Sequence, residues 1–92
     1  MKAIIKKYIV KNERGLHARM CARFINVTND YDCRLRVTKD RETVDGKSII
    51  GLLTLAASCG STLMVRIEGE RKERNGCAEE LQKLFDLEEE TV

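Results

Sequence analysis

The sequence has no proline and no tryptophan, and aromatic residues make up only 4% of its 92 positions. No low-complexity segment occurs, and no segment repeats at the period of a solenoid protein. So few aromatics leave no stacking motif of the kind that RNA-binding and single-strand-binding modules use. No apolar run is long enough for a secretory signal or a membrane span, because Lys6 and Lys7 interrupt the first one. These absences predict a cytoplasmic protein without membrane insertion.

The composition is that of an ordinary globular domain. Hydrophobic residues form 42% and charged residues 35% of the chain, and positive and negative side chains are mixed along it. The formal net charge is only +2, too balanced to predict a nucleic-acid or membrane partner. A length of 92 residues allows one domain but not two, so we expect a single domain over residues 1–92 and a monomer.

Potential metal ligands and reactive thiols are sparse and scattered. The four cysteines lie far apart and form no Cys-x-x-Cys pair; they are Cys21, Cys33, Cys59 and Cys77. Without an export signal we expect reduced thiols, buried as small hydrophobic side chains. The one histidine, His17, lies near no cysteine pair. We therefore expect no zinc site, and no metal or cofactor.

The spacing of apolar residues predicts seven secondary-structure elements. Alternation predicts half-buried strands, and spacings of three and four predict amphipathic helices. In chain order these are a strand at 2–10, a helix from 18 to about 29, a strand at 33–38, a short strand around 43–44, a helix from 48 through 59, a strand at 62–68 and a final helix carrying 77–85. Ser48 is placed to cap the second helix, and Gly60 to end it in a left-handed conformation.

The polar faces of these strands favour an antiparallel sheet whose helices lie on one side only. The expected fold is therefore α+β: an open-faced β-sandwich of order β-α-β-β-α-β-α, in which three helices cover one face of a four-stranded antiparallel sheet. In the second helix we expect the core face to comprise Leu52, Leu55, Ala56 and Cys59.

His17 stands between a glycine turn and the start of a predicted helix, in the segment 15–19, Gly-Leu-His-Ala-Arg. Backbone N–H groups at a helix start have no intrahelical partner, so a phosphoryl group on the ring would lie near the amides of Ala18 and Arg19. The positive end of the helix dipole favours a neutral, nucleophilic imidazole, and the Arg19 guanidinium could add a charge-assisted contact. Taken alone, however, the segment is explained more simply by an ordinary cap histidine and a solvated arginine.

A second segment, 44–53, carries more than a helix cap. Capping explains Ser48, but it does not explain Ile50 and Leu53, which lie away from the expected core face, with Ile49 near its border. Exposed apolar residues near a helix start predict a docking surface. A phosphate on Ser48 would place negative charge beside that surface without altering the fold.

Together these two segments resemble the HPr family of the bacterial phosphoenolpyruvate-dependent phosphotransferase system. Segment 15–19 is similar to the family's active-site motif, and segment 45–53 is similar to its regulatory-serine motif. The interval from His17 to Ser48, the glycine at position 60, segment 67–70 and the terminal helix also suit the family. The resemblance covers nearly the whole chain.

The resemblance implies a phosphocarrier rather than a stand-alone enzyme. His17 would accept a phosphoryl group from enzyme I, on the ring nitrogen facing the helix amides, and pass it to an enzyme II A-component. Arg19 would steady the phosphoryl group, and Ser48 would be the regulatory site of a serine kinase/phosphorylase. The partner surface would comprise Met20, Ile49, Ile50 and Leu53.

Three residues depart from the family pattern. Met20 stands where proline usually follows the active-site arginine, which predicts a less rigid helix start and an adaptable contact residue. Cys21 replaces a common alanine and is expected in the core. Arg14 occupies a position where many members carry a small polar residue that helps to orient the histidine.

Two alternatives remain beside the phosphocarrier. The departures at Met20 and Arg14 are compatible with a regulatory paralogue that acts mainly through Ser48 phosphorylation and partner binding, although members that have given up relay typically lack the histidine. A small α+β nucleic-acid-binding module is suggested by Arg34 and Arg36 on one strand face. The balanced charge and scarce aromatics argue against it.

Overall fold

The computed structural model describes residues 2–88, and its four strands form one antiparallel sheet in the order β1-β4-β2-β3. The predicted domain bounds, 1–92, extend to residue 1 and residues 89–92, which lie outside the described residues. β4 pairs with both β1 and β2, so it occupies an interior position in the sheet. The strands are β1 (Ala3–Ile9), β2 (Arg34–Lys39), β3 (Glu42–Asp45) and β4 (Thr62–Glu68).

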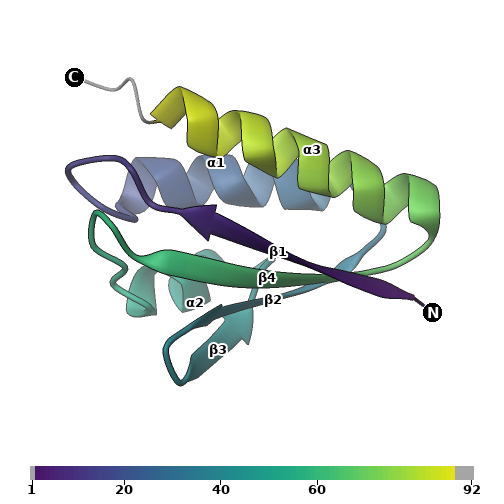
Figure 1. Ribbon diagram of the computed structural model, residues 1–92, viewed down its shortest axis with the longest axis horizontal. Coiled ribbons are helices and arrows are strands. Elements are labelled where there is room, and N and C mark those ends of the chain that lie inside the picture. Colours follow the sequence, from purple (N-terminus) through teal and green to yellow (C-terminus); the bar gives the residue numbers. More distant parts are fainter. Residues whose placement is uncertain (1, 89–92) are drawn as a thin grey trace.

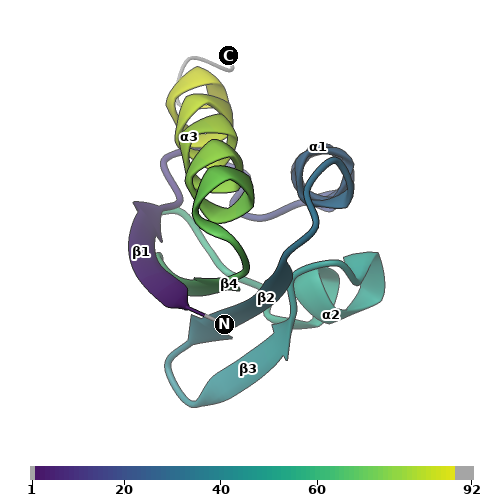
Figure 2. The ribbon, with the colours of Figure 1, turned by 90° about the vertical axis from the view of Figure 1, so that its right-hand side faces the viewer.

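Three helices cover one face of this sheet and leave the other face uncovered (Figures 1 and 2). They are α1 (Ala18–Asn29), α2 (Ile49–Thr54) and α3 (Arg71–Glu88). α1 packs between the other two, in contact with both. The predicted α+β open-faced sandwich and its β-α-β-β-α-β-α order are confirmed. Among the described residues, no helix combines the length and the hydropathy that a membrane crossing requires.

The core lies between the sheet and the helices, and sequence alternation explains how the strands build it. In β4, Leu63, Val65 and Ile67 have no exposed surface, whereas the residues between them face away from the helices. α3 meets the sheet through Phe85, whose ring stacks on that of Tyr8 with 4.9 Å between centroids. Each large side chain buried in this way stabilises the fold by about 1.5–3 kcal/mol.

The second helix is much shorter than predicted: it ends at Thr54, not at residue 59. Ala56 adopts a positive φ of 48°, and the following residues bond to the loop after β1 instead of continuing the helix. Leu52 and Leu55 are buried as expected, but Ala56 and Cys59 are exposed, which corrects the predicted core face. Gly60 has a positive φ of 93°, but it stands in the turn before β4 rather than at the end of a helix.

The cysteines follow the prediction with one exception. All four are free, and three are buried, namely Cys21, Cys33 and Cys77. Cys59 is exposed, because it lies in the irregular segment that replaces the end of the predicted helix. Within residues 2–88 no three potential metal ligands come together.

Candidate functional site

His17 is the N-cap residue of α1, as the sequence predicted. Its backbone is extended, with φ −85° and ψ 175°, and its carbonyl accepts the first bond of the helix, from the Cys21 N–H at 2.9 Å. The imidazole makes no capping hydrogen bond and is half-buried, so it remains accessible at the helix start. His17 is thus the N-cap residue by its backbone, while its side chain makes no capping bond.

The backbone N–H groups beside His17 are unpartnered. In residues 2–88 the amides of Ala18, Arg19 and Met20 bond to no acceptor, and no acidic side chain occupies the first turn of α1. Such groups carry the positive end of the helix dipole and bind anions. The Arg19 side chain is exposed and makes no hydrogen bond or ion pair within the described residues. An incoming anion therefore displaces no competing acceptor.

Asn12 contacts the His17 ring, and sequence reasoning missed it. Its Nδ2 lies 3.1 Å from His17 Nε2, and its Oδ1 accepts a 2.8 Å hydrogen bond from the Arg14 backbone N–H. Asn12 is only 3% exposed, so these bonds satisfy a buried amide. A signal was present: asparagine opens a turn that ends at Gly15, whose N–H donates to the Asn12 carbonyl at 2.9 Å.

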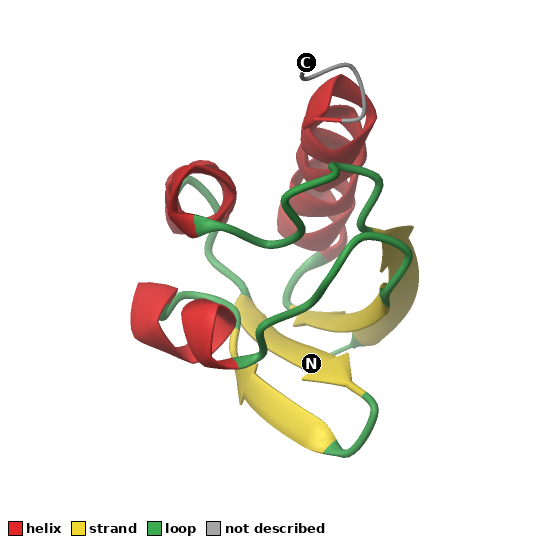
Figure 3. Ribbon diagram, turned by 90° about the vertical axis from the view of Figure 1, so that its left-hand side faces the viewer, coloured by secondary structure: helices red, strands yellow, loops and turns green. Residues whose placement is uncertain are grey.

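The loop that follows β1 and carries His17 is bonded to the loop between α2 and β4, and Figure 3 shows the loops of this end of the molecule in green. The Leu16 N–H donates to the Ala57 carbonyl at 2.7 Å, directly before His17. The Val10 N–H donates to the Ser61 carbonyl at 2.9 Å, and the Val10 carbonyl accepts a hydrogen bond from the Gly60 N–H at 2.7 Å. The irregular segment after α2 therefore serves as the support of the loop that carries His17.

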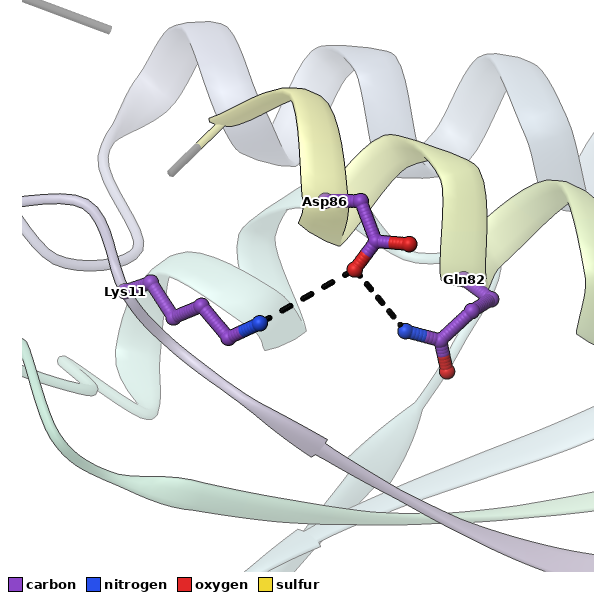
Figure 4. Close-up of polar contacts among 3 residues, drawn as sticks. All are labelled: Lys11, Gln82 and Asp86. Carbon is purple, nitrogen blue, oxygen red and sulfur yellow. Dashed lines mark hydrogen bonds and ion pairs between the residues drawn. The ribbon is translucent and has the colours of Figure 1, made fainter. Parts of the chain in front are cut away.

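The end of α3 is also tied to this loop (Figure 4). Lys11 Nζ lies 3.8 Å from Asp86 Oδ1, and the same oxygen accepts a 3.0 Å hydrogen bond from Gln82 Nε2. Both charged side chains are substantially exposed, so the pair contributes at most about 1 kcal/mol. Its effect is to restrain the residue directly before Asn12.

Ser48 caps α2, as predicted. Its Oγ accepts a 3.1 Å hydrogen bond from the Gly51 N–H, and its own N–H donates to the Asp45 carbonyl at 3.1 Å. The Asp45 carboxylate in turn accepts from the Lys47 N–H at 2.9 Å. A helix of only six residues depends strongly on such a cap.

Three apolar side chains of α2 are open to solvent. Ile50 is 72% exposed, and Ile49 and Leu53 are 40% exposed, whereas Leu52 is fully buried. Because α2 packs beside α1 (Figure 2), this patch lies on the helix next to the one that His17 begins. The patch formed by Ile49, Ile50 and Leu53 is called the α2 patch below.

Comparison with known proteins agrees with this geometry. Residues 4–86 match the model of the family described as the PTS HPr component phosphorylation site. The chain belongs to the HPr family. The phosphocarrier protein HPr of Pseudomonas aeruginosa is 41% identical over 78 residues, which cover 82% of this chain and 87% of the relative.

Other relatives extend the likeness. The crystal structure of HPr-C-His from Thermoanaerobacter tengcongensis is similar with a TM-score of 0.82 and 29% identity, covering 100% of this chain and 99% of that one. The HPr-like protein Crh of Halalkalibacterium halodurans is 39% identical over 64 residues, which cover 70% of this chain and 76% of the relative. Membership in the HPr family makes this chain a phosphocarrier-type protein of the phosphotransferase system, whose members act with the enzymes of that system.

Two departures from the HPr pattern turn out to be core residues. The prediction that Met20 lies on the partner surface is wrong, since Met20 is only 1% exposed. Its spacing from Phe24 places both side chains on the buried face of α1. Cys21 is fully buried as expected, and burial raises the pKa of its thiol to about 11. This thiol, which donates to the Leu16 carbonyl at 3.7 Å, packs in the core as a neutral group.

Proposed function

We propose that this HPr-family chain relays a phosphoryl group between two proteins. His17 accepts the group from phosphorylated enzyme I and transfers it to an enzyme II A-component. The observation that carries the proposal is the state of the His17 ring. Nε2 is engaged by Asn12, whereas Nδ1 has no hydrogen-bond partner within residues 2–88, so Nδ1 is the ring nitrogen available to bind phosphorus.

The chemistry of the relay follows from the groups around this nitrogen. Nδ1 gives up its proton as its electron pair attacks phosphorus, the bond to the donor atom of enzyme I breaks, and the donor atom keeps the electron pair of that bond and takes up the proton. The unpartnered amides of Ala18 and Arg19 offer hydrogen bonds to the phosphoryl oxygens, and the Arg19 guanidinium adds a positive charge. Transfer to the acceptor protein reverses the same steps at the same atom.

The setting proposed for the relay is a monomeric, cytoplasmic domain spanning residues 1–92, and the α2 patch is the surface on which partners dock. An exposed apolar cluster beside the histidine-bearing helix suits partners that must bring their own phosphoryl donor or acceptor atom to His17. The relay as proposed uses no cofactor or metal, because the Ala18 and Arg19 amides and the Arg19 guanidinium supply the hydrogen bonds and positive charge for the phosphoryl oxygens.

The decisive experiment is phosphorylation by enzyme I with labelled phosphoenolpyruvate. Wild-type protein should gain one acid-labile phosphate per chain, and His17→Ala should gain none while giving the same circular dichroism spectrum as wild type. Absence of label on wild type, or equal label on His17→Ala, would contradict the proposal. Transfer of the label to an enzyme II A-component tests the second half of the relay.

A regulatory role through Ser48 is the second candidate. Two observations favour it: the Ser48 hydroxyl caps α2 directly beside the α2 patch, and the similar solved structures include Crh, described as the Bacillus subtilis catabolite repression HPr. A phosphate there would be accepted by the helix dipole and would place charge next to apolar docking residues. A serine kinase/phosphorylase would be the partner. Ser48→Asp should then weaken or redirect partner binding; unchanged binding of every partner tested would eliminate this candidate.

A further inference from the structure

The contact between Asn12 and His17 has a fixed polarity. The Arg14 backbone N–H can only donate, so the Asn12 atom that it meets at 2.8 Å is the carbonyl oxygen Oδ1. Nδ2 is therefore the atom that faces the ring, at 3.1 Å from His17 Nε2. An amide Nδ2 is a donor without acceptor capacity, so Nε2 must be the acceptor in this hydrogen bond.

This polarity determines which ring nitrogen carries the proton. A neutral imidazole has one N–H and one acceptor nitrogen. With Nε2 held as acceptor, the proton of the neutral ring resides on Nδ1, the atom to which we assign phosphoryl binding. A proton placed on Nε2 would instead point at the N–H of Asn12.

We propose that Asn12 is a positioning residue that keeps His17 Nε2 unprotonated and thereby prolongs the lifetime of the phosphoryl group on Nδ1. The inference rests on the relay proposed above. In the phosphorylated ring Nδ1 carries phosphorus instead of hydrogen, and Nε2 keeps its electron pair. The same Asn12 donor therefore fits the phosphorylated ring as well as it fits the free one.

Loss of the phosphoryl group to water shows why the Nε2 proton matters. Water oxygen attacks phosphorus, the Nδ1–P bond breaks, its electron pair stays on Nδ1, and phosphate is released with the protons that water brought. When Nε2 is protonated, the leaving group is a neutral imidazole. When Nε2 is unprotonated, it is an imidazolate anion, a far poorer leaving group. Because Asn12 keeps Nε2 unprotonated, it favours the poorer leaving group and so slows the hydrolysis of the phosphoryl group.

Arg14 contributes to this arrangement through its backbone. Position 14 carries arginine, whose side chain is exposed. Its backbone N–H, not its side chain, serves the site by fixing the orientation of the Asn12 amide. The buried position of Asn12 prevents water from replacing the bond to the ring.

The test is Asn12→Asp, which keeps the shape of the side chain and an oxygen for the Arg14 N–H but replaces the donor by a second acceptor. Nitrogen-15 NMR of the histidine ring in the unphosphorylated protein, at a pH where the ring is neutral, reads the proton position directly. Wild type should carry it mainly on Nδ1, and Asn12→Asp should move it to Nε2, changing the ratio of the two forms by about tenfold or more. A wild-type proton mainly on Nε2, or the same ratio in both proteins, would overturn the inference.

Lifetime is measured on protein phosphorylated by enzyme I and then freed of enzyme I. At neutral pH Asn12→Asp should lose phosphate about tenfold faster than wild type, and Asn12→Ala, which removes the donor without adding charge, should lose it about threefold faster. Asn26→Asp, an exposed substitution on α1, adds the same charge away from the ring and should match wild type. If only Asn12→Asp changes the rate, its charge is the cause and the inference is wrong.

The two measurements separate this inference from the relay itself. If enzyme I phosphorylates neither wild type nor the variants, but NMR places the wild-type proton on Nδ1 and moves it in Asn12→Asp, the proposed relay fails while the control of the His17 proton by Asn12 stands. If phosphorylation succeeds and the proton lies on Nε2 in wild type, the relay stands and the role of Asn12 is refuted.

Discussion

The backbone of Gly15 lies directly against the carbonyl of Ala57: a Cβ atom placed on Gly15 would come within 2.5 Å of that oxygen. Gly15 also has a φ of +72°, which side-chain-bearing residues rarely adopt. The next residue, Leu16, donates its N–H to the same carbonyl at 2.7 Å. The closeness of the two loops and the position of His17, two residues further on, therefore depend on the same glycine.

We predict that Gly15→Ala lowers the free energy of unfolding by roughly 2–4 kcal/mol, the sum of a left-handed backbone and a steric overlap. Gly60→Ala is the matched control, because Gly60 also has a positive φ but has no atom within 4 Å of an added Cβ. Gly60→Ala should lower the free energy of unfolding by only about 1–2 kcal/mol. Urea denaturation measures both, and equal losses would show that the contact with Ala57 carries no cost of its own.

Removal of the α2 cap should destabilise the protein modestly. Ser48→Ala deletes the acceptor for the Gly51 N–H, and we expect a loss of about 1 kcal/mol. Ser48→Asp provides another good cap and should retain most of the wild-type stability. Thermal unfolding of the two variants checks this. A loss for Ser48→Asp as large as that for Ser48→Ala would show that the hydrogen bond to Gly51 is not what stabilises α2.

Stability should fall at alkaline pH because buried thiols resist ionisation. Burial, then the nearby Cys33, raises the pKa of Cys77 from 9.0 to about 12, and burial raises that of Cys21 to about 11. Above pH 9.0 the unfolded chain releases these protons before the folded chain does, so each thiol lowers the free energy of unfolding by up to about 1.4 kcal/mol per pH unit. Below pH 9.0 this contribution is fully retained.

The measurement is urea denaturation between neutral pH and about pH 11, the range in which the thiols of an unfolded chain ionise. Cys77→Ala should lower the stability at neutral pH, because it leaves a cavity, yet show a shallower decline on the alkaline side. Cys59→Ser removes an exposed thiol and should leave the decline unchanged. The same slope in wild type and Cys77→Ala would contradict the assignment.

The α2 patch should matter for docking and not for stability. Ile50→Asp alters a side chain that is 72% exposed, so we expect the free energy of unfolding to change by less than about 0.5 kcal/mol. The rate of phosphorylation by enzyme I should fall about tenfold or more. Ile5→Asp is the matched control, since Ile5 is 60% exposed but lies on the uncovered sheet face. An equal effect of both substitutions would mean that the docking surface is not specific to α2.

Much of the fold could be predicted because its signals are local. The alternation in β4 predicts its buried face correctly, because a strand has only two faces and the apolar residues of β4 all lie on one of them, apart from the half-exposed Met64. Ser48 could be identified as a cap because its partner, the Gly51 N–H, is three residues away. His17 could be placed at a helix start because the glycine turn and the apolar spacing of α1 flank it directly.

The errors and omissions involve contacts between distant segments. The end of α2 depends on Ala57 and Gly60 bonding to the loop after β1, which no local pattern shows. The role of Asn12 depends on the fold of the turn that follows it. Met20 is different: we expected it on the partner surface because it replaces the family's proline and methionine is an adaptable contact residue, but its side chain lies with that of Phe24 on the buried face of α1.

The bonds that join Val10 and Leu16 to residues 57–61 also have a consequence for the order of folding. These contacts span a long loop, whose closure costs entropy before any contact is gained. These bonds can form only when β1 and β4 have paired. α1 can form earlier, because its hydrogen bonds join residues that are close in the sequence. A chain still emerging from the ribosome, with α1 formed but β4 not yet synthesised, therefore has no preorganised histidine. Only molecules that have completed the sheet can hold His17 in its working position.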